Sequence, residues 1–265
     1  MKVNTVCMTL VASRNLTTLF ASCCMLHPDI QVLNHFPSIN SDNKTNFLVD
    51  YTDDKLNNFV NKVDQINKDQ LNKVGEGGII TTDHAFSSNE GLRNAFHERF
   101  SSEHKKDFKS IVWKDSPRNT LLLQKINMDG LLAKTDKLRF VLIVRNPMDC
   151  ATSSSAPGYN QRYRLPSKEH ILSELFERYE WFFDAERKHP GHFMSFFEFD
   201  PDYELVCKLQ NFLMIDNDEQ WKNNFLKFWV MKRKYNHTAE FKKQYHSLIK
   251  NITDEKLQRK FKRYL

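Results

Sequence analysis

A polar segment near the amino terminus has the residue types of an anion-binding loop. It runs Ser13-Arg14-Asn15-Leu16-Thr17-Thr18, between an apolar run and a stretch with helical spacing. The first backbone N–H groups of a helix have no partner within the helix, so a loop there binds phosphate or sulfate. Arg14 would add a fixed positive charge, and Thr17 and Thr18 would add hydroxyl donors. The segment therefore predicts an anion cradle; the alternative is a threonine-capped turn with Arg14 in solvent.

A second anion site is predicted after the apolar run Phe140 to Val144. Arg145-Asn146-Pro147-Met148-Asp149 follows this run, and a cluster of hydroxyl residues comes next, at positions 152 to 155. In open α/β sheets ligands bind beyond the carboxyl ends of the strands, which is where Arg145 would lie. The alternative is a surface Arg–Asp pair followed by a polar loop. Two anion sites after two strands predict a ligand with two separated anionic groups.

The elements that must position these residues follow the pattern of an α/β protein. Val3 to Ala12 is short, apolar and rich in β-branched residues, as a buried parallel strand is. Helical spacing follows over Thr17 to Leu26, with Thr17 or Thr18 as the N-cap. Further strands are predicted at Ile30 to Leu33, Ile79 to Thr82, Ser110 to Trp113, Phe140 to Val144 and Phe193 to Phe197, and further helices within residues 40–75, 89–101, 119–134, 171–183 and 203–213.

This alternation predicts an α/β fold in a single domain over residues 1–265. We expect a central parallel sheet flanked by helices, a strand–loop–helix unit at the start and a helical C-terminal part. No internal repeat and no linker-like stretch divides the chain.

The amino-acid composition excludes several classes of ligand and partner for this protein. Only 7 of the 265 residues are glycine, and none lies in G-x-G-x-x-G or G-x-x-x-x-G-K-[ST], so the conventional dinucleotide and ATPase loops are absent. The net charge of +6, from 39 basic and 33 acidic residues, is too small to predict a nucleic-acid partner. The five cysteines lack C-x-x-C spacing, so we predict no metal site.

The amino-terminal apolar run lacks the character of a secretory signal. Asn4 and Thr5 interrupt it, and Ser13-Arg14-Asn15 follows it. No stretch reaches the roughly 18 apolar residues of a membrane span. We therefore expect a cytoplasmic protein without a membrane partner; the sequence leaves its oligomeric state open.

Several segments together resemble the sulfotransferase family. Residues 138–155, L-R-F-V-L-I-V-R-N-P-M-D-C-A-T-S-S-S, resemble its 3′-phosphate-binding segment. The opening A-S-R-N-L-T-T-L-F, followed by H-P-D-I-Q-V-L-N-H, resembles its 5′-phosphosulfate loop, helix and second strand, and is closest to the tyrosylprotein-sulfotransferase-like and bacterial small-molecule branches. Residues 111–118, I-V-W-K-D-S-P-R, resemble the acceptor-side strand end, and F-F-E-F-D-P-D resembles a late strand and helix. The match spans most of residues 3–213, in the family's order.

The resemblance implies a P-loop-like enzyme that uses 3′-phosphoadenosine 5′-phosphosulfate (PAPS) as co-substrate, without a metal. Arg14 falls where the family has Lys or Arg, and Thr17 and Thr18 match its paired threonines. With Asn15 and Leu16, they would hold the 5′-phosphosulfate.

Leu16 falls where the family usually has glycine. A leucine holds such a turn only if its φ stays negative or the strain is offset nearby. On the other side of the ligand, Arg145 and Ser153 fall on the family's arginine and serine for the 3′-phosphate.

Transfer of a sulfuryl group to an acceptor would need a base and groups that stabilise developing charge. His35 falls where the tyrosylprotein branch has its catalytic Glu, and histidine titrates near neutral pH as a general base should; the alternative is a histidine that is merely hydrogen-bonded in a loop. Arg14 would stabilise the leaving phosphate. Lys114 would stabilise the bridging oxygen, unless it is only the snorkelling end of a strand. Asp115 would contact the acceptor, and His84 is a second candidate base.

Two other functions remain open beside the leading one. A nucleotide or nucleoside kinase would use a similar strand–loop–helix cradle, although the G-K-[ST] sequence is missing. A non-catalytic binding protein with a sulfotransferase fold would be consistent with Leu16 in place of glycine. The leading hypothesis is a sulfotransferase that acts on a hydroxyl or amine of a small-molecule acceptor, whose identity the sequence does not show.

Overall fold

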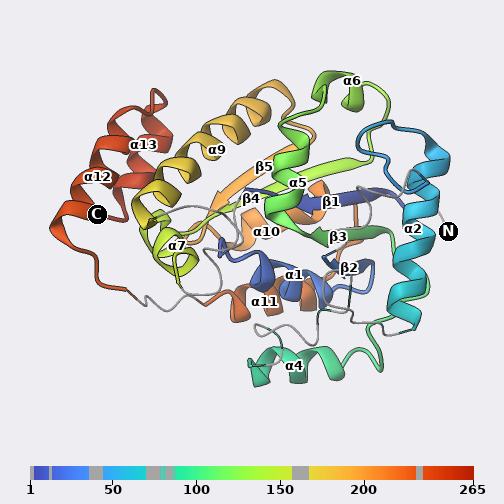
Figure 1. The fold of residues 1–265 in the computed structure, drawn as a ribbon. Coiled ribbons are helices and arrows are strands. Elements are labelled where there is room, and N and C mark those ends of the chain that lie inside the picture. The colour runs from blue at the N-terminus through green and yellow to red at the C-terminus, as the bar shows by residue number, and fades with distance from the viewer. Residues whose placement is uncertain are drawn as a thin grey trace.

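Five parallel strands form the centre of the molecule (Figure 1). The computed structural model describes residues 3–11, 14–35, 44–69, 78, 80, 86, 88–156, 167–230 and 235–265. The sheet order is β2-β3-β1-β4-β5, and all four neighbouring pairs are parallel. The α/β fold predicted from the sequence is confirmed. The strands are β1 (Thr5–Thr9), β2 (Ile30–Asn34), β3 (Ser110–Lys114), β4 (Leu138–Val144) and β5 (Phe193–Phe197).

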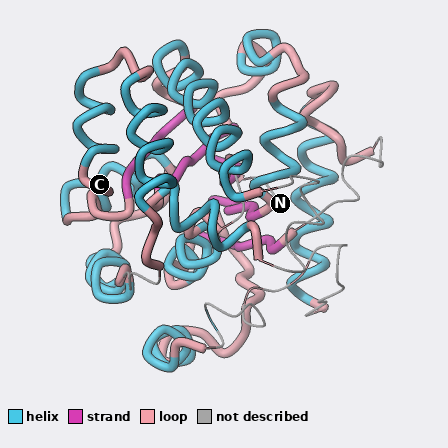
Figure 2. The backbone as a smooth tube through the Cα atoms, turned by 60° about the vertical axis from the view of Figure 1, so that its left-hand side comes forward, coloured by secondary structure: helices cyan, strands magenta, loops and turns pink. Residues whose placement is uncertain are grey.

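Alternate residues of the strands enter two separate hydrophobic clusters, one on each face of the sheet, because successive side chains of a strand point to opposite faces. Cys7 belongs to the first cluster, whereas Val6 and Met8 belong to the second. Helices therefore cover both faces (Figure 2). The first cluster includes α1 (Thr17–Met25), α4 (Glu90–His97), α10 (Tyr203–Phe212) and α11 (Glu219–Phe228). The second includes α2 (Asp53–Lys68), α5 (Ser116–Leu123), α6 (Met128–Leu132), α7 (Pro147–Ser154), α9 (Lys168–Lys188), α12 (Ala239–Lys250) and α13 (Glu255–Lys262).

Two predicted elements differ from the observed ones. The first strand was expected over Val3 to Ala12, but β1 ends at Thr9, because the next residues turn into a loop in which Val11 has a φ of 80°. The helix expected over residues 119–134 is two helices, α5 and α6, and Asn127 caps the second by accepting a hydrogen bond from the Gly130 N–H. The strand predicted at Ile79 to Thr82 lies, apart from Ile80, outside the described residues.

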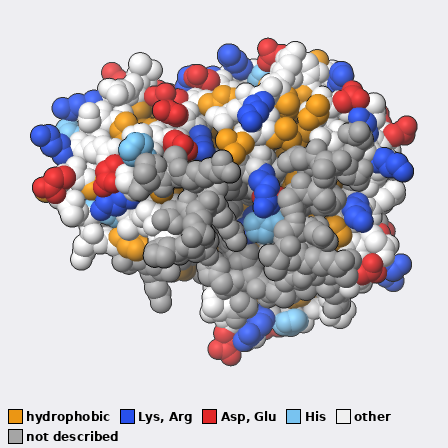
Figure 3. Space-filling view, viewed as in Figure 1, with side chains coloured by type: hydrophobic (Ala, Val, Ile, Leu, Met, Phe, Trp, Pro, Cys, Tyr) orange, Lys and Arg blue, Asp and Glu red, His pale blue; other side chains and the backbone are white. Residues whose placement is uncertain are grey.

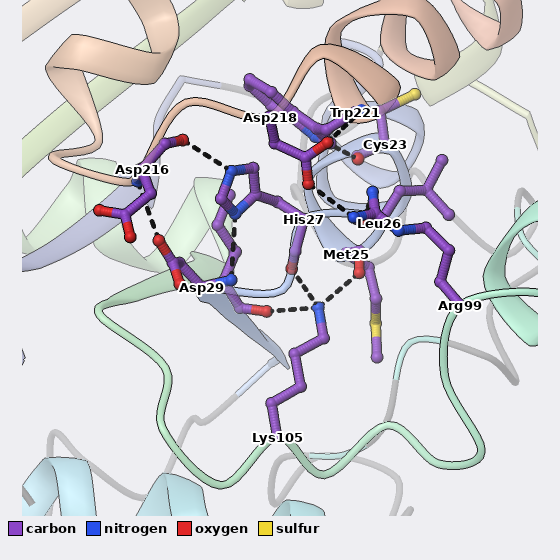
Figure 4. Close-up of polar contacts among 11 residues, drawn as sticks. Cys23, Met25, Leu26, His27, Asp29, Arg99, Lys105, Asp216, Asp218 and Trp221 are labelled. Carbon is purple, nitrogen blue, oxygen red and sulfur yellow. Dashed lines mark hydrogen bonds and ion pairs between the residues drawn. The ribbon is translucent and has the colours of Figure 1, made fainter.

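The carboxyl-terminal end of α1 is closed by a buried lysine (Figure 4). Lys105 Nζ donates to the carbonyl oxygens of Met25, His27 and Ile30 at 2.5, 2.5 and 2.8 Å. The Met25 carbonyl belongs to the last turn of α1 and has no partner further along the helix, so the lysine Nζ satisfies its hydrogen-bonding capacity at the negative end of the helix dipole. Arg99 adds a bond to the Leu26 carbonyl at 2.9 Å. The helix is thus fixed at the end opposite to the predicted anion loop.

Candidate functional site

The loop after β1 is fixed by contacts with the neighbouring strand β4 and with the helix α5. The Leu10 N–H donates to the Val141 carbonyl of β4 at 2.9 Å. The Val11 N–H donates to the Thr120 hydroxyl of α5 at 2.5 Å. Three described loop residues have positive φ: Val11 at 80°, Arg14 at 68° and Leu16 at 59°. A β-branched residue such as Val11 rarely takes this conformation. Several long-range contacts therefore hold the loop in a conformation that it would not adopt alone.

Leu16 is the N-cap of α1 and has left-handed backbone angles, with φ 59° and ψ 12°. The predicted threonine cap is wrong, because the helix begins at Thr17 and its cap position is occupied by a leucine with no side-chain hydrogen bond. The Leu16 side chain packs partly buried against the cluster on the α1 face, which offsets part of the strain. The hydroxyls of Thr17 and Thr18 lie in the first turn instead. The first N–H groups of α1 are therefore left without a side-chain cap.

Asn15 joins this loop to the segment after β4. Its side chain is fully buried, and its Oδ1 accepts hydrogen bonds from the Arg145 N–H and from the Tyr179 hydroxyl, each at 3.3 Å. Arg145 Nη1 also donates to the Arg14 carbonyl at 3.1 Å. The Asn15 Nδ2 atom is buried and has no hydrogen-bond partner among the described residues. The two anion sites predicted separately from the sequence are therefore one connected structure with a spare buried donor.

Arg145 extends from the end of β4 into a buried charged cluster. Its Nη2 lies 3.9 Å from Asp149 Oδ2, and the other carboxylate oxygen of Asp149 lies 2.7 Å from His237 Nε2. Only 13% of the Arg145 side chain and 6% of the Asp149 side chain are exposed, so the alternative of a surface Arg–Asp pair is wrong. His237 precedes α12, and its contact with Asp149 buries the pair.

The residues that follow Arg145 form a helix rather than the polar loop of the alternative interpretation. Asn146 caps α7 by accepting hydrogen bonds from the N–H groups of Met148 and Asp149 at 3.0 and 3.4 Å. Ser153 is half-buried in the second turn of α7. The neighbouring Thr152 hydroxyl is buried and has no hydrogen-bond partner within the described residues.

On the other side of the loop, Lys114 ends β3. It is the register partner of Thr9, the last residue of β1, and of Asn34, the last residue of β2. Lys114 is 7% exposed, and its Nζ donates to Asn34 Oδ1 at 2.9 Å. The lysine therefore does not snorkel into solvent but lies between the ends of two strands, beside the start of the loop.

His35 and Asp115 follow directly after β2 and β3. The His35 N–H donates to the Lys114 carbonyl at 3.0 Å, and His35 Nδ1 lies 3.4 Å from Asp115 Oδ1. Arg118 in α5 contacts both oxygens of Asp115 at 3.2 and 3.0 Å. Burial raises the pKa of Asp115, but the hydrogen bond to His35 and the charge of Arg118 outweigh it, so this pKa lies below its ordinary value. Asp115 is therefore a buried carboxylate between two possible cations.

The candidate site residues thus meet at the carboxyl edge of the sheet, where ligands of such folds bind. Along the strand order, His35 follows β2, Lys114 ends β3, the loop with Arg14 follows β1, and Arg145 follows β4. Figure 3 shows a basic side chain and a histidine side by side near the centre of the face that it presents. His84, the second candidate base, lies outside the described residues.

Sequence reasoning missed three residues that support the site. Thr120, Tyr179 and His237 contact Val11, Asn15 and Asp149 respectively. None lies in a segment with a recognisable motif, because their roles arise from contacts with residues far along the chain.

Within the described part of the chain, no group of three or more His, Cys, Asp or Glu side chains could hold a metal ion. In the same residues, no helix is long and apolar enough to cross a membrane.

Comparison with known proteins gives likenesses in structure only. No protein-family model and no curated protein matches the sequence. The crystal structure of mouse sulfotransferase SULT7A1 complexed with PAP aligns with 100% of this chain and 88% of that chain, at 12% identity and a TM-score of 0.49. The sulfotransferase domain from the Synechococcus PCC 7002 olefin synthase aligns over 92% of this chain and 94% of that chain, at 12% identity and a TM-score of 0.41. Neither likeness identifies a ligand or a reaction for this chain.

Proposed function

We propose that this protein is a sulfotransferase that moves a sulfuryl group from PAPS to a hydroxyl or amine of a small-molecule acceptor. The observation that carries the proposal is the direct connection of two anion sites, through the bonds from Arg145 to Asn15 and to the Arg14 carbonyl. PAPS has anionic groups at both its 5′ and 3′ sides, and such a connected pair of sites suits it. The resemblance of the two segments to the 5′ and 3′ loops of sulfotransferases supports the same ligand.

The loop after β1 would hold the 5′-phosphosulfate. The hydrogen-bond donors would be the uncapped N–H groups of α1 and the hydroxyls of Thr17 and Thr18. The left-handed backbone of Leu16 forms the turn into the helix, and Arg14 would add positive charge. The buried Nδ2 of Asn15 has no partner among the described residues, so a ligand oxygen would satisfy it. These fixed donors are most valuable where negative charge develops, on the leaving phosphate.

Arg145 and Ser153 would hold the 3′-phosphate. Asp149 keeps the Arg145 guanidinium in place from one side, while the Arg14 carbonyl holds it from the other. Because Arg145 is mostly buried, its charge is poorly screened by solvent, and a phosphate would gain more from it than from a surface arginine.

His35 would accept the proton that the acceptor loses as its oxygen or nitrogen bonds to sulfur. The S–O bond to the leaving phosphate breaks in the same reaction, which releases adenosine 3′,5′-bisphosphate. Lys114 lies beside the start of the loop and would stabilise the bridging oxygen as this bond breaks. The proton goes to His35 and then to solvent, to which 41% of the histidine side chain is exposed.

Incubation of the protein with PAPS and a panel of hydroxyl and amine acceptors, read by mass spectrometry, tests the activity. The expected result is an acceptor that gains one sulfuryl group without added Mg²⁺. ATP with Mg²⁺ in place of PAPS tests the kinase alternative. Phosphorylated products would overturn the proposal, and binding of the bisphosphate without transfer to any acceptor would favour the non-catalytic alternative.

Replacement of His35 separates binding from chemistry. We expect His35→Ala to keep the affinity for adenosine 3′,5′-bisphosphate and to lower turnover by about 10²–10⁴-fold, the usual contribution of a general base. Turnover is measured with saturating PAPS. Unchanged turnover would contradict the role of His35 and move the base to Lys114 or His84.

A further inference from the structure

We propose that Asp115 is a positioning residue that holds His35 with its proton on Nδ1, so that Nε2 is left to accept the proton of the acceptor. This inference rests on the proposed function, because it assigns how the base of that reaction is oriented. It concerns a pair of residues from two neighbouring strand ends, which no sequence motif joins.

The direction of the hydrogen bond follows from the two partners. Asp115 has 3% of its side chain exposed and is held by Arg118, so it is an ionised carboxylate that only accepts hydrogen bonds. Its Oδ1 lies 3.4 Å from His35 Nδ1, which must therefore carry the hydrogen. A neutral histidine has one N–H, so its Nε2 keeps a lone pair. The pair thus selects the tautomer that a base acting through Nε2 requires.

The backbone around His35 brings the ring to Asp115. His35 has a φ of 64°, a left-handed conformation that histidine adopts more readily than most residues. Its N–H donates to the Lys114 carbonyl at 3.0 Å. This bond holds His35 next to the end of β3, and Asp115 is the first residue after that strand. The strained backbone of His35 is consistent with a histidine ring that must be held toward Asp115.

The His35–Asp115 pair differs from the other histidine–aspartate pairs described in the structure. His104, His189 and His237 contact their aspartates through Nε2, whereas His35 uses Nδ1. The aspartates of His104 and His189 are 29% and 82% exposed. Only the His35 pair combines a buried carboxylate with a histidine that is 41% exposed at the carboxyl edge. An exposed ring with its Nδ1 bound inward is suited to react through Nε2.

The carboxylate would also assist the reaction itself. When Nε2 takes a proton, the ring becomes positive, and the adjacent carboxylate stabilises this charge. Among the described residues, His35 Nδ1 contacts the Asp115 carboxylate, the Arg118 guanidinium contacts the same carboxylate, and Lys114 accepts the His35 N–H hydrogen bond through its backbone carbonyl. Removal of the Asp115 charge would leave the Arg118 guanidinium near the ring without its carboxylate partner, and this positive charge would disfavour a second one on the ring.

The test replaces Asp115 by Asn, which keeps the shape but removes the charge and can donate to Nδ1. We expect Asp115→Asn to lower kcat by about 10- to 100-fold, less than the ~10⁴-fold for a fully buried triad. The KM for PAPS should stay the same, and the lower limb of the pH profile should move to lower pH. Asp115→Glu, which restores the carboxylate, should recover part of kcat.

A spectroscopic readout makes the inference independent of activity. In ¹⁵N NMR of the free protein, with the His35 signals identified by their loss in His35→Gln, we expect the Nδ1–H tautomer in wild type and in Asp115→Glu, and its loss in Asp115→Asn. Asp129→Asn is the matched control, because Asp129 is 82% exposed beside His189, and it should change neither readout.

The inference is overturned if His35 of the wild type carries its hydrogen on Nε2, or if Asp115→Asn leaves both tautomer and kcat unchanged. Failure of the proposed function gives a different result, in which the tautomer depends on Asp115 but no acceptor receives a sulfuryl group. Calorimetry with adenosine 3′,5′-bisphosphate shows whether each variant keeps its folded nucleotide site.

Discussion

The loop after β1 contains three residues whose backbone conformation is costly for an L-amino acid. Val11, Arg14 and Leu16 all have φ between 59° and 80°. Left-handed backbone costs roughly 1–2 kcal/mol per residue, a cost that glycine avoids. The contacts of Val11 with Thr120 and of Asn15 with Arg145 and Tyr179 hold these residues in place. A glycine-poor chain can therefore hold a loop with left-handed residues when neighbouring elements stabilise it.

A comparison of glycine and alanine at position 16 tests this strain. Both variants lose the packing of the Leu16 side chain, and they differ only in the Cβ atom and in backbone entropy. We expect Leu16→Gly to be more stable than Leu16→Ala by about 0.5–1 kcal/mol, because alanine bears the left-handed strain and glycine does not. Urea denaturation of both variants gives the difference.

The exposed helical residue Glu177 of α9 provides the control. There the order should reverse, with Glu177→Ala more stable than Glu177→Gly by about 1 kcal/mol. The same preference for alanine at position 16 would show that Leu16 is not left-handed in solution.

At the scale of elements, α1 is held at both ends. Its amino-terminal end faces the candidate anion site, and its carboxyl-terminal carbonyls accept hydrogen bonds from Lys105 and Arg99 (Figure 4). Arg99 also pairs with Asp218 at 2.6 Å, and the Trp221 Nε1 donates to the Cys23 carbonyl at 3.0 Å. These contacts connect α1 to α11 and to its N-cap residue Asp218. The position of the anion loop thus depends on residues at the far end of its helix.

Lys105 makes the stability of this arrangement depend on pH. Burial lowers the pKa of Lys105 to about 7 from its ordinary value of 10.5. Between these two values the unfolded chain binds a proton that the folded protein does not, so the free energy of unfolding rises with pH. Below pH 7 both states are protonated, and this contribution to the slope vanishes.

We therefore expect the stability of the wild type, relative to Lys105→Met, to increase from pH 7 to pH 9, by at most about 1.4 kcal/mol per pH unit. Urea denaturation at pH 6, 7, 8 and 9 measures the difference, and the variant cancels the contributions of all other groups. A difference that does not change over this range would contradict the lowered pKa of Lys105.

The sequence predicted the elements better than the contacts between them. Short apolar runs predicted all five described strands, because strands that are buried on both faces need nearly every residue to be apolar. The candidate anion-binding residues could be proposed from the sequence because the loop and its helix are adjacent along the chain. The joining contacts were not, since Thr120 lies 109 residues from Val11, and His237 lies 88 residues from Asp149. Pairs so far apart arise only from the folded arrangement of the sheet.

At the scale of the whole molecule, the end of the chain supports the strand that carries Arg145. The Tyr264 hydroxyl donates to the Val144 carbonyl at 2.9 Å, directly before Arg145, and His237 binds Asp149. The helix α12 packs against α7, α9 and α13 (Figure 1). The helical C-terminal part predicted from the sequence thus contacts the strand end and the helix that carry the candidate residues Arg145 and Asp149.

The central claim is that the joined loops bind a nucleotide with two anionic groups, and calorimetry with adenosine 3′,5′-bisphosphate tests it most directly. We expect the wild type to bind, and Arg145→Ala to bind about 10- to 100-fold more weakly, the loss of one or two charge-assisted hydrogen bonds. Arg259→Ala, which removes an arginine that is 77% exposed on α13, is the control and should bind like the wild type. Equal affinity of the wild type and Arg145→Ala, or no binding by the wild type, would contradict the claim.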